Sequence, residues 1–173
     1  DSGTHGLELS NNAGIVSVTN NLTVTNASDA SISIQSGDGI IGLGNATIGS
    51  RNNVGLSINS SGSQISVDSL VIDNPNVTSG NAVEISNLFG AGFTASSLDI
   101  RHAVLSAVFL TSNSAPININ GGSITNASGN AVDIRLGGGD VNIASAINNA
   151  SERSVQVLNR SGGTVTLSGF IDD

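Results

Sequence analysis

The stretch ITNASGNAVDI (residues 124–134) decides how this chain folds. A short β-like run ends at Asn126, small residues follow, and a second run begins at Ala131. Variants of this stretch recur as VTNASDASISI (24–34), VIDNPNVTSGNAVEI (71–85) and INNASERSVQV (147–157). A stretch that returns with the same order of apolar and turn residues predicts a repeat protein, in which each copy is one structural unit.

The repeat is about 25 residues long and holds three short runs of period-two alternation, the pattern of β-strands. The first run contains the pairs Leu7/Leu9, Ile32/Ile34, Leu56/Ile58, Val83/Ile85, Val108/Leu110, Val132/Ile134 and Val155/Val157. A second run follows nine or ten residues later. The third is anchored by Val24, Ile48, Ile72, Ile100, Ile124, Ile147 and Ile171. These apolar positions are the expected core.

We expect each strand to pair in parallel with its counterpart one repeat further on, because no hairpin signature joins neighbouring runs. The sequence therefore predicts an all-β fold, a right-handed three-sheet parallel β-helix of about seven coils. Residues 1–173 form a single domain in this interpretation. The longer connection DNPNVTSGNA (73–82) predicts a loop that bulges outward.

The residue two positions after each third-strand anchor is expected to turn the corner into the next coil. Asn tolerates the left-handed backbone that a sharp corner needs. Asn side chains stacked at strand spacing can also hydrogen-bond along the axis. We therefore predict a structural corner ladder of Asn26, Asn74, His102, Asn126 and Asn149, with Ser50 and Asp173 at the two remaining corners.

The three strands, the coil length and the Asn corner resemble the right-handed parallel β-helix repeat of pectate-lyase-like enzymes, phage tailspikes, bacterial autotransporter passengers and large surface adhesins. SGNAVDI (128–134) and LNRSGGTVTLSGFI (158–171) are similar to repeats of the long bacterial surface proteins. The resemblance covers essentially the whole chain. It implies the fold and favours a bacterial extracellular or cell-surface location, but it is not specific for function.

Composition excludes several kinds of partner. The net charge is −8, and the five basic residues, all Arg, do not cluster, so nucleic-acid binding is disfavoured. The chain has no run of 18 apolar residues, so the sequence predicts no membrane-spanning helix. The chain has no Cys, Trp or Tyr, which excludes disulfides and removes the usual sugar-stacking side chains.

The best carboxylate pair for catalysis is Glu84 and Asp133, on one expected sheet face and two coils apart. At strand spacing this is roughly 9 to 10 Å, close to the separation used by inverting glycoside hydrolases. Phe109 stands between them, and the chain has no Lys and no Asp cluster. Solvated charges on a strand face are the favoured interpretation, so we expect no catalytic residue, cofactor or metal.

The sequence favours a non-catalytic structural or adhesive β-helix, either a segment of a longer surface protein or a subunit that stacks head to tail into a filament. The strands of the first and last coils are unpaired edges, so a second copy of the chain is the expected partner. Host or surface glycans are further expected partners. The alternative function is a polysaccharide-active or glycan-binding β-helix using Glu84 and Asp133.

Overall fold

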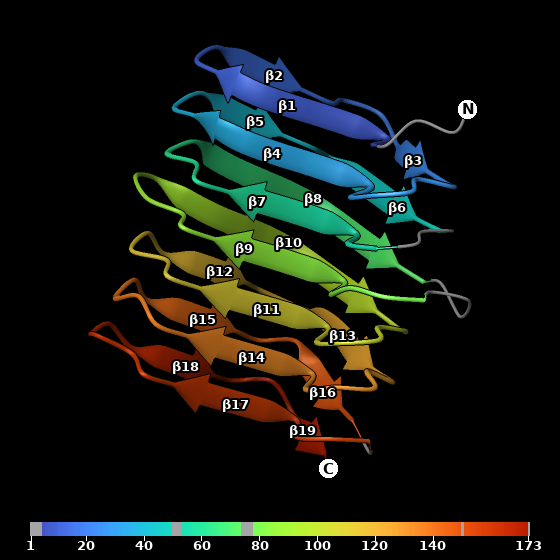
Figure 1. Cartoon of the computed structure of the whole chain (residues 1–173), viewed down its shortest axis with the longest axis vertical. Helices are drawn as coiled ribbons and strands as arrows, with labels where there is room; N and C mark the ends of the chain where they lie inside the picture. Colours follow the sequence, from blue (N-terminus) through green and yellow to red (C-terminus); the bar gives the residue numbers. More distant parts are fainter. Residues whose placement is uncertain (1–4, 50–52, 74–77, 150, 173) are drawn as a thin grey trace.

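The computed structural model describes residues 5–49, 53–73, 78–149 and 151–172, and they form nineteen β-strands and no helix. The strands build a solenoid of seven coils (Figure 1). In that view the first strand of each coil runs in front, the second returns behind it, and the chain descends from the N-terminus. The front strands point to the left of the view and the rear strands to the right while the chain descends, so the winding is right-handed, as predicted. In the described part of the chain, no helix could span a membrane.

The first strands of the coils form one parallel seven-stranded sheet, here called sheet A. Its strands are β1 (Leu7–Asn12), β4 (Ile32–Gly37), β7 (Leu56–Asn59), β9 (Val83–Ser86), β11 (Val108–Thr111), β14 (Val132–Arg135) and β17 (Val155–Leu158). Each residue pairs with its equivalent one repeat away, for example Val108 with Val132 and Val132 with Val155. The parallel pairing deduced from the repeat is therefore confirmed.

The remaining strands form one twelve-stranded parallel sheet, sheet B, which covers two faces of the solenoid. One face contains β2 (Ile15–Ser17), β5 (Ile40–Gly42), β12 (Ile117–Ile119), β15 (Val141–Ile143) and β18 (Val165–Leu167). The other contains β3 (Leu22–Val24), β6 (Asn45–Ile48), β13 (Gly122–Thr125), β16 (Ala146–Asn148) and β19 (Ile171–Asp172). Two long strands, β8 (Gln64–Ile72) and β10 (Gly92–Ile100), run across both faces.

The three predicted sheets are the three faces of the solenoid. Coils two and five bend between the second and third faces at Gly44 and Gly122, whose φ angles are 55° and 99°. In coil three the register places Asp68 opposite Gly44 and Leu70 at the position of Gly122, and neither has a positive φ. Because β8 and β10 cross from one face to the other, the two faces share one hydrogen-bonded sheet.

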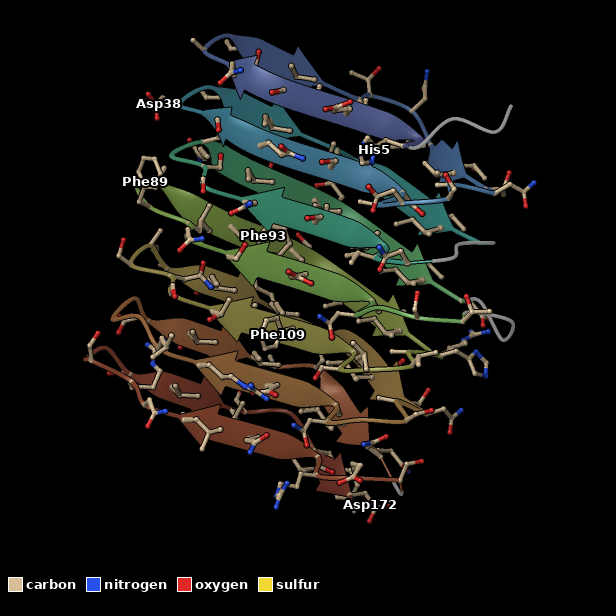
Figure 2. All side chains as sticks on the ribbon, in the orientation of Figure 1. His5, Asp38, Phe89, Phe93, Phe109 and Asp172 are labelled. Carbon is tan, nitrogen blue, oxygen red and sulfur yellow. The ribbon has the colours of Figure 1, made fainter. Side chains whose placement is uncertain are left out.

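Aliphatic side chains fill the narrow interior. In sheet A, Leu56, Val83, Val108 and Val132 are all fully buried and stack on one another along the axis. Phe93 is the one buried aromatic residue of the described chain (Figure 2). Predicted core positions in the central coils are buried as expected. Most of those in coils one and seven are partly covered, since each coil has a neighbour on one side only, whereas Val24 is buried and Val157 and Ile171 are exposed.

A left-handed residue stands within one residue of the end of every sheet A strand. These residues are Asn11, Ser36, Ser60, Asn87, Ser112, Leu136 and Asn159, with φ between 48° and 56°. Side chains destabilise this conformation, least so for Asn. Leu136 differs from the other six, which are Asn or Ser, because its side chain has no polar group that could hydrogen-bond the local backbone. Sequence reasoning placed the left-handed corner only after the third strand and missed this one.

Replacing Leu136 by Asn is expected to stabilise the protein by about 1 kcal/mol, because a residue that tolerates left-handed backbone relieves the strain there. Urea denaturation followed by circular dichroism measures the change. Leu105→Asn is the matched control, since Leu105 is similarly exposed and does not have a positive φ. Equal shifts in both variants would contradict the corner assignment.

Replacing Ile134 by Asp is expected to lower the free energy of unfolding by several kcal/mol or to unfold the solenoid, because it buries an unpaired charge. The same measurement on Asn142→Asp is the control, since Asn142 is exposed on sheet B. A fully folded Ile134→Asp protein, as stable as this control, would show that the interior is not closed.

Candidate functional site

A groove lies on the outer surface around sheet A, across coils four to seven, with a volume of about 510 Å³. Phe109 on β11 and Asp133 on β14 lie on its floor, because both occupy the outward position of the strand alternation. The register places Glu84, Phe109, Asp133 and Gln156 in one row. The predicted order, with Phe109 between the two carboxylates, is confirmed, and Figure 2 shows Phe109 on the front sheet.

Asp133 is the central charge of the groove, and its side chain is only 2% exposed. Arg135 donates from Nε to Oδ1 at 2.9 Å and from Nη2 to Oδ2 at 2.7 Å. Asn130 donates from Nδ2 to Oδ2 at 3.1 Å and to Gln156 Oε1 at 2.6 Å. Asp133 is therefore a buried carboxylate whose two oxygens both accept hydrogen bonds, and the prediction of a solvated charge at this position was wrong. Its partners cover it although its strand position points outward.

Arg135 is held in one orientation by this network. The hydrogen bonds to Asp133, and then its negative charge, raise the pKa of Arg135 above its usual value, so the guanidinium is charged at every physiological pH. The guanidinium also lies 5.5 Å from the centre of the Phe109 ring, within the range of a cation–π contact. A fixed positive charge over an aromatic ring is the result.

Glu84 lies two strands from Asp133 and has different surroundings. Its Oε2 accepts a hydrogen bond of 3.0 Å from Asn81 Nδ2. Asn81 and Glu84 occupy the same places in SGNAVEI as Asn130 and Asp133 do in SGNAVDI, so one short motif produces both Asn–carboxylate bonds. Glu84 has no partner like Arg135, because the residue two positions further is Ser86.

The predicted corner residues differ in their roles. Asn26 and Asn126 adopt the left-handed conformation, with φ of 61° and 55°. The buried Asn149 donates from Nδ2 to the carbonyl of Gly129 at 2.9 Å. Asn74 and the two further corner residues, Ser50 and Asp173, lie outside the described residues, as does part of the 73–82 connection. The continuous axial ladder stays a prediction.

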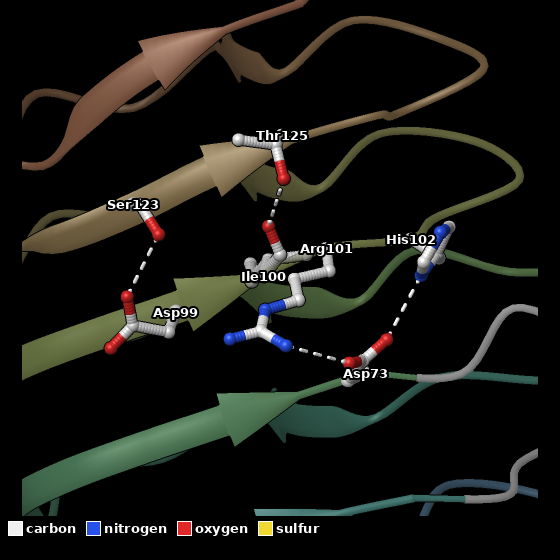
Figure 3. A network of polar contacts seen from close by, with 7 residues as sticks. All are labelled: Asp73, Asp99, Ile100, Arg101, His102, Ser123 and Thr125. Atoms are coloured by element: carbon white, nitrogen blue, oxygen red, sulfur yellow. Dashed lines mark hydrogen bonds and ion pairs between the residues drawn. The ribbon is translucent and has the colours of Figure 1, made fainter.

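His102 belongs to a polar network that joins coils three and four (Figure 3). Its Nδ1 lies 2.9 Å from Asp73 Oδ1, and Arg101 Nη1 lies 3.2 Å from Asp73 Oδ2. Between coils four and five, Ser123 Oγ on β13 donates to Asp99 Oδ1 on β10 at 2.8 Å. These contacts fix side chains between coils on the surface, and sequence reasoning, which placed His102 in the corner ladder, did not identify its pairing with Asp73.

Sequence reasoning also missed Asn130, Arg135 and Arg153 as members of a shared groove. The alternation of side chains along a strand could have indicated that Arg135 lies beside Asp133, since residues two apart share one strand face. Arg153 follows the turn of coil seven and lines the groove from there. The described residues contain no group of three His, Cys, Asp or Glu side chains that could hold a metal ion.

Replacing Arg135 by Gln is expected to destabilise the fold by about 3 kcal/mol, because it leaves the charge of Asp133 buried and uncompensated. Adding Asp133→Asn to this variant should recover most of the loss, since the buried charge then disappears. Urea denaturation of the single and double variants measures both effects.

Arg101→Gln is the control, because the Arg101–Asp73 pair is exposed and pairs of that kind contribute at most about 1 kcal/mol. If Arg135→Gln were no more destabilising than Arg101→Gln, the Asp133 network would not have the structural importance assigned to it.

Comparison with known proteins identified no relative: no family model, no curated protein and no solved structure matches the chain.

Proposed function

We propose that this chain is a non-catalytic structural or adhesive β-helix of the bacterial cell surface, either a segment of a longer solenoid or a subunit of a filament. The observation that carries the proposal is the unbroken parallel ladder from β1 to β17, in which every coil pairs in the same register with the next. A uniform ladder of this kind produces a stiff rod whose length is set by the number of coils.

The interior supports the same role. Successive coils place aliphatic residues on aliphatic residues, so each coil needs a neighbour to cover its apolar edge. At strand spacing the seven coils span roughly 34 Å. Such a rod separates what is attached to its two ends, as a stalk or spacer does.

Axial association follows from the outermost coils. Val157 and Ile171 in coil seven are 44% and 41% exposed, and Leu7 and Leu9 in coil one are only partly buried. Their strands offer backbone donors and acceptors above an apolar cross-section. The next coil that covers them comes either from a continuing chain or from a second copy stacked head to tail.

A glycan-binding or polysaccharide-active protein is the second candidate, favoured by the groove that contains Phe109 and Asp133. Both oxygens of Asp133 are bound by Arg135 and Asn130, which favours binding over turnover. A screen with acidic and neutral polysaccharides tests the catalytic alternative. Turnover abolished by Glu84→Gln and by Asp133→Asn would replace the structural proposal with this one.

The filament form of the proposal predicts that the purified chain assembles end to end as its concentration rises, since stacking extends both sheets and buries both apolar ends. Electron microscopy and sedimentation velocity measure this. Val157→Lys should stop growth and leave the central coils folded, because it places an unpaired charge in the mating surface.

Asn142→Lys is the control, since it adds the same charge to the exposed side of the rod, and filaments should persist. Dispersed particles seven coils long at high concentration would reject self-stacking.

A further inference from the structure

We propose that the groove on sheet A binds a small ligand with a single carboxylate group and an apolar face, held by Arg135 and Arg153. This site goes beyond the structural role, and its test does not depend on whether the chain forms filaments.

Arg135 offers a preorganised half of an anion site. Its Nε and Nη2 donate to Asp133, whereas Nη1 makes no hydrogen bond with any described residue. Asp133 and the Phe109 ring already fix the orientation of the guanidinium, so a ligand would not have to immobilise a mobile side chain. A planar guanidinium matches the geometry of a carboxylate.

Arg153 supplies a second positive charge one coil further along. Its side chain lines the groove and makes no hydrogen bond or ion pair with the described residues, and its backbone is fixed because its carbonyl accepts a bond of 3.0 Å from Ala131 N. The unpaired cation is therefore available to a ligand.

The charge balance of the groove selects among anions. Glu152 also lines it, so the charges of Asp133, Arg135, Glu152 and Arg153 cancel. A doubly charged phosphate would meet Glu152 without a compensating excess of positive charge. A monocarboxylate needs only one partner charge, and the unpaired Arg153 together with the outer edge of Arg135 provides it.

Apolar side chains lie beside the two cations. Phe109 is partly exposed on the groove floor, and Leu105 is 54% exposed at its side. Asn130 Oδ1 accepts no hydrogen bond from the described residues, so it can accept one from a ligand hydroxyl group. The site therefore fits a carboxylate attached to a flat or weakly polar body.

Isothermal titration calorimetry with sodium benzoate tests the site, with benzyl alcohol as the uncharged probe and acetate as the carboxylate without a ring. Inorganic phosphate, at a pH above its second pKa, is the doubly charged anion. We expect saturable binding of benzoate, weaker binding of acetate, and no saturable binding of benzyl alcohol or phosphate. Equal, unsaturable heats from benzoate and benzyl alcohol would overturn the proposal.

Variants assign the binding to the groove. Arg153→Gln should weaken benzoate binding by about tenfold or more, since hydrogen bonds to charged groups contribute about 1.5 to 3 kcal/mol. The double variant Asp133→Asn/Arg135→Gln, in which no buried charge is left unpaired, keeps Arg153 and should weaken benzoate binding by a comparable factor. Leu105→Ser should weaken benzoate but not acetate.

Arg101→Gln is the matched control, because it removes the same charge outside the groove, and it should bind benzoate like the unaltered protein. Circular dichroism confirms that each variant is folded before titration. If Arg153→Gln and Arg101→Gln bind benzoate equally well, the groove is not the site and the proposal fails.

Discussion

The parallel backbone ladder between successive coils is the interaction on which the rest of this structure depends. Each residue of sheet A pairs with its equivalent one repeat away, so like stacks on like: Val83 on Val108, and Val108 on Val132. This registration builds the aliphatic core and places a left-handed residue at the same corner of every coil. Because the side-chain period of a strand is two, a slip of one residue would turn the core outward.

The same constraint creates the groove. Stacking at strand spacing brings Glu84, Phe109, Asp133 and Gln156 into one outward row, although they are far apart in the sequence. The neighbouring side chains then determine which residues of this row are covered and which are exposed. Asn130 and Arg135 cover Asp133 and hold it as an ion pair, whereas Phe109 remains partly exposed beneath the guanidinium. The groove that contains the proposed anion site therefore arises from the same coil repeat that builds the core.

Much of the fold could be predicted because apolar side chains recur at the same positions of every repeat. The strand positions, the parallel pairing and the order Glu84–Phe109–Asp133 all follow from the period. The fusion of two faces in β8 and β10 did not, because it depends on backbone angles between two runs that look alike in every coil. The corner at Asn11, Ser36 and Leu136 was missed because these residues share a conformation and not a chemical type. The burial of Asp133 could not be predicted from the strand pattern, because it depends on the side-chain conformation of Arg135, which reaches back to cover the carboxylate.

The most direct test of the stacked register is a pair of distances along the solenoid. The chain has no Cys, so spin labels can be attached at Ser17→Cys and Thr166→Cys, or at Ser66→Cys and Thr166→Cys, all outward positions of sheet B. The first pair is separated by six strand steps and the second by four. Double electron–electron resonance should give narrow distributions near roughly 29 Å and 19 Å, about 10 Å apart. Broad distributions, or distances that do not scale with the number of coils, would contradict the account.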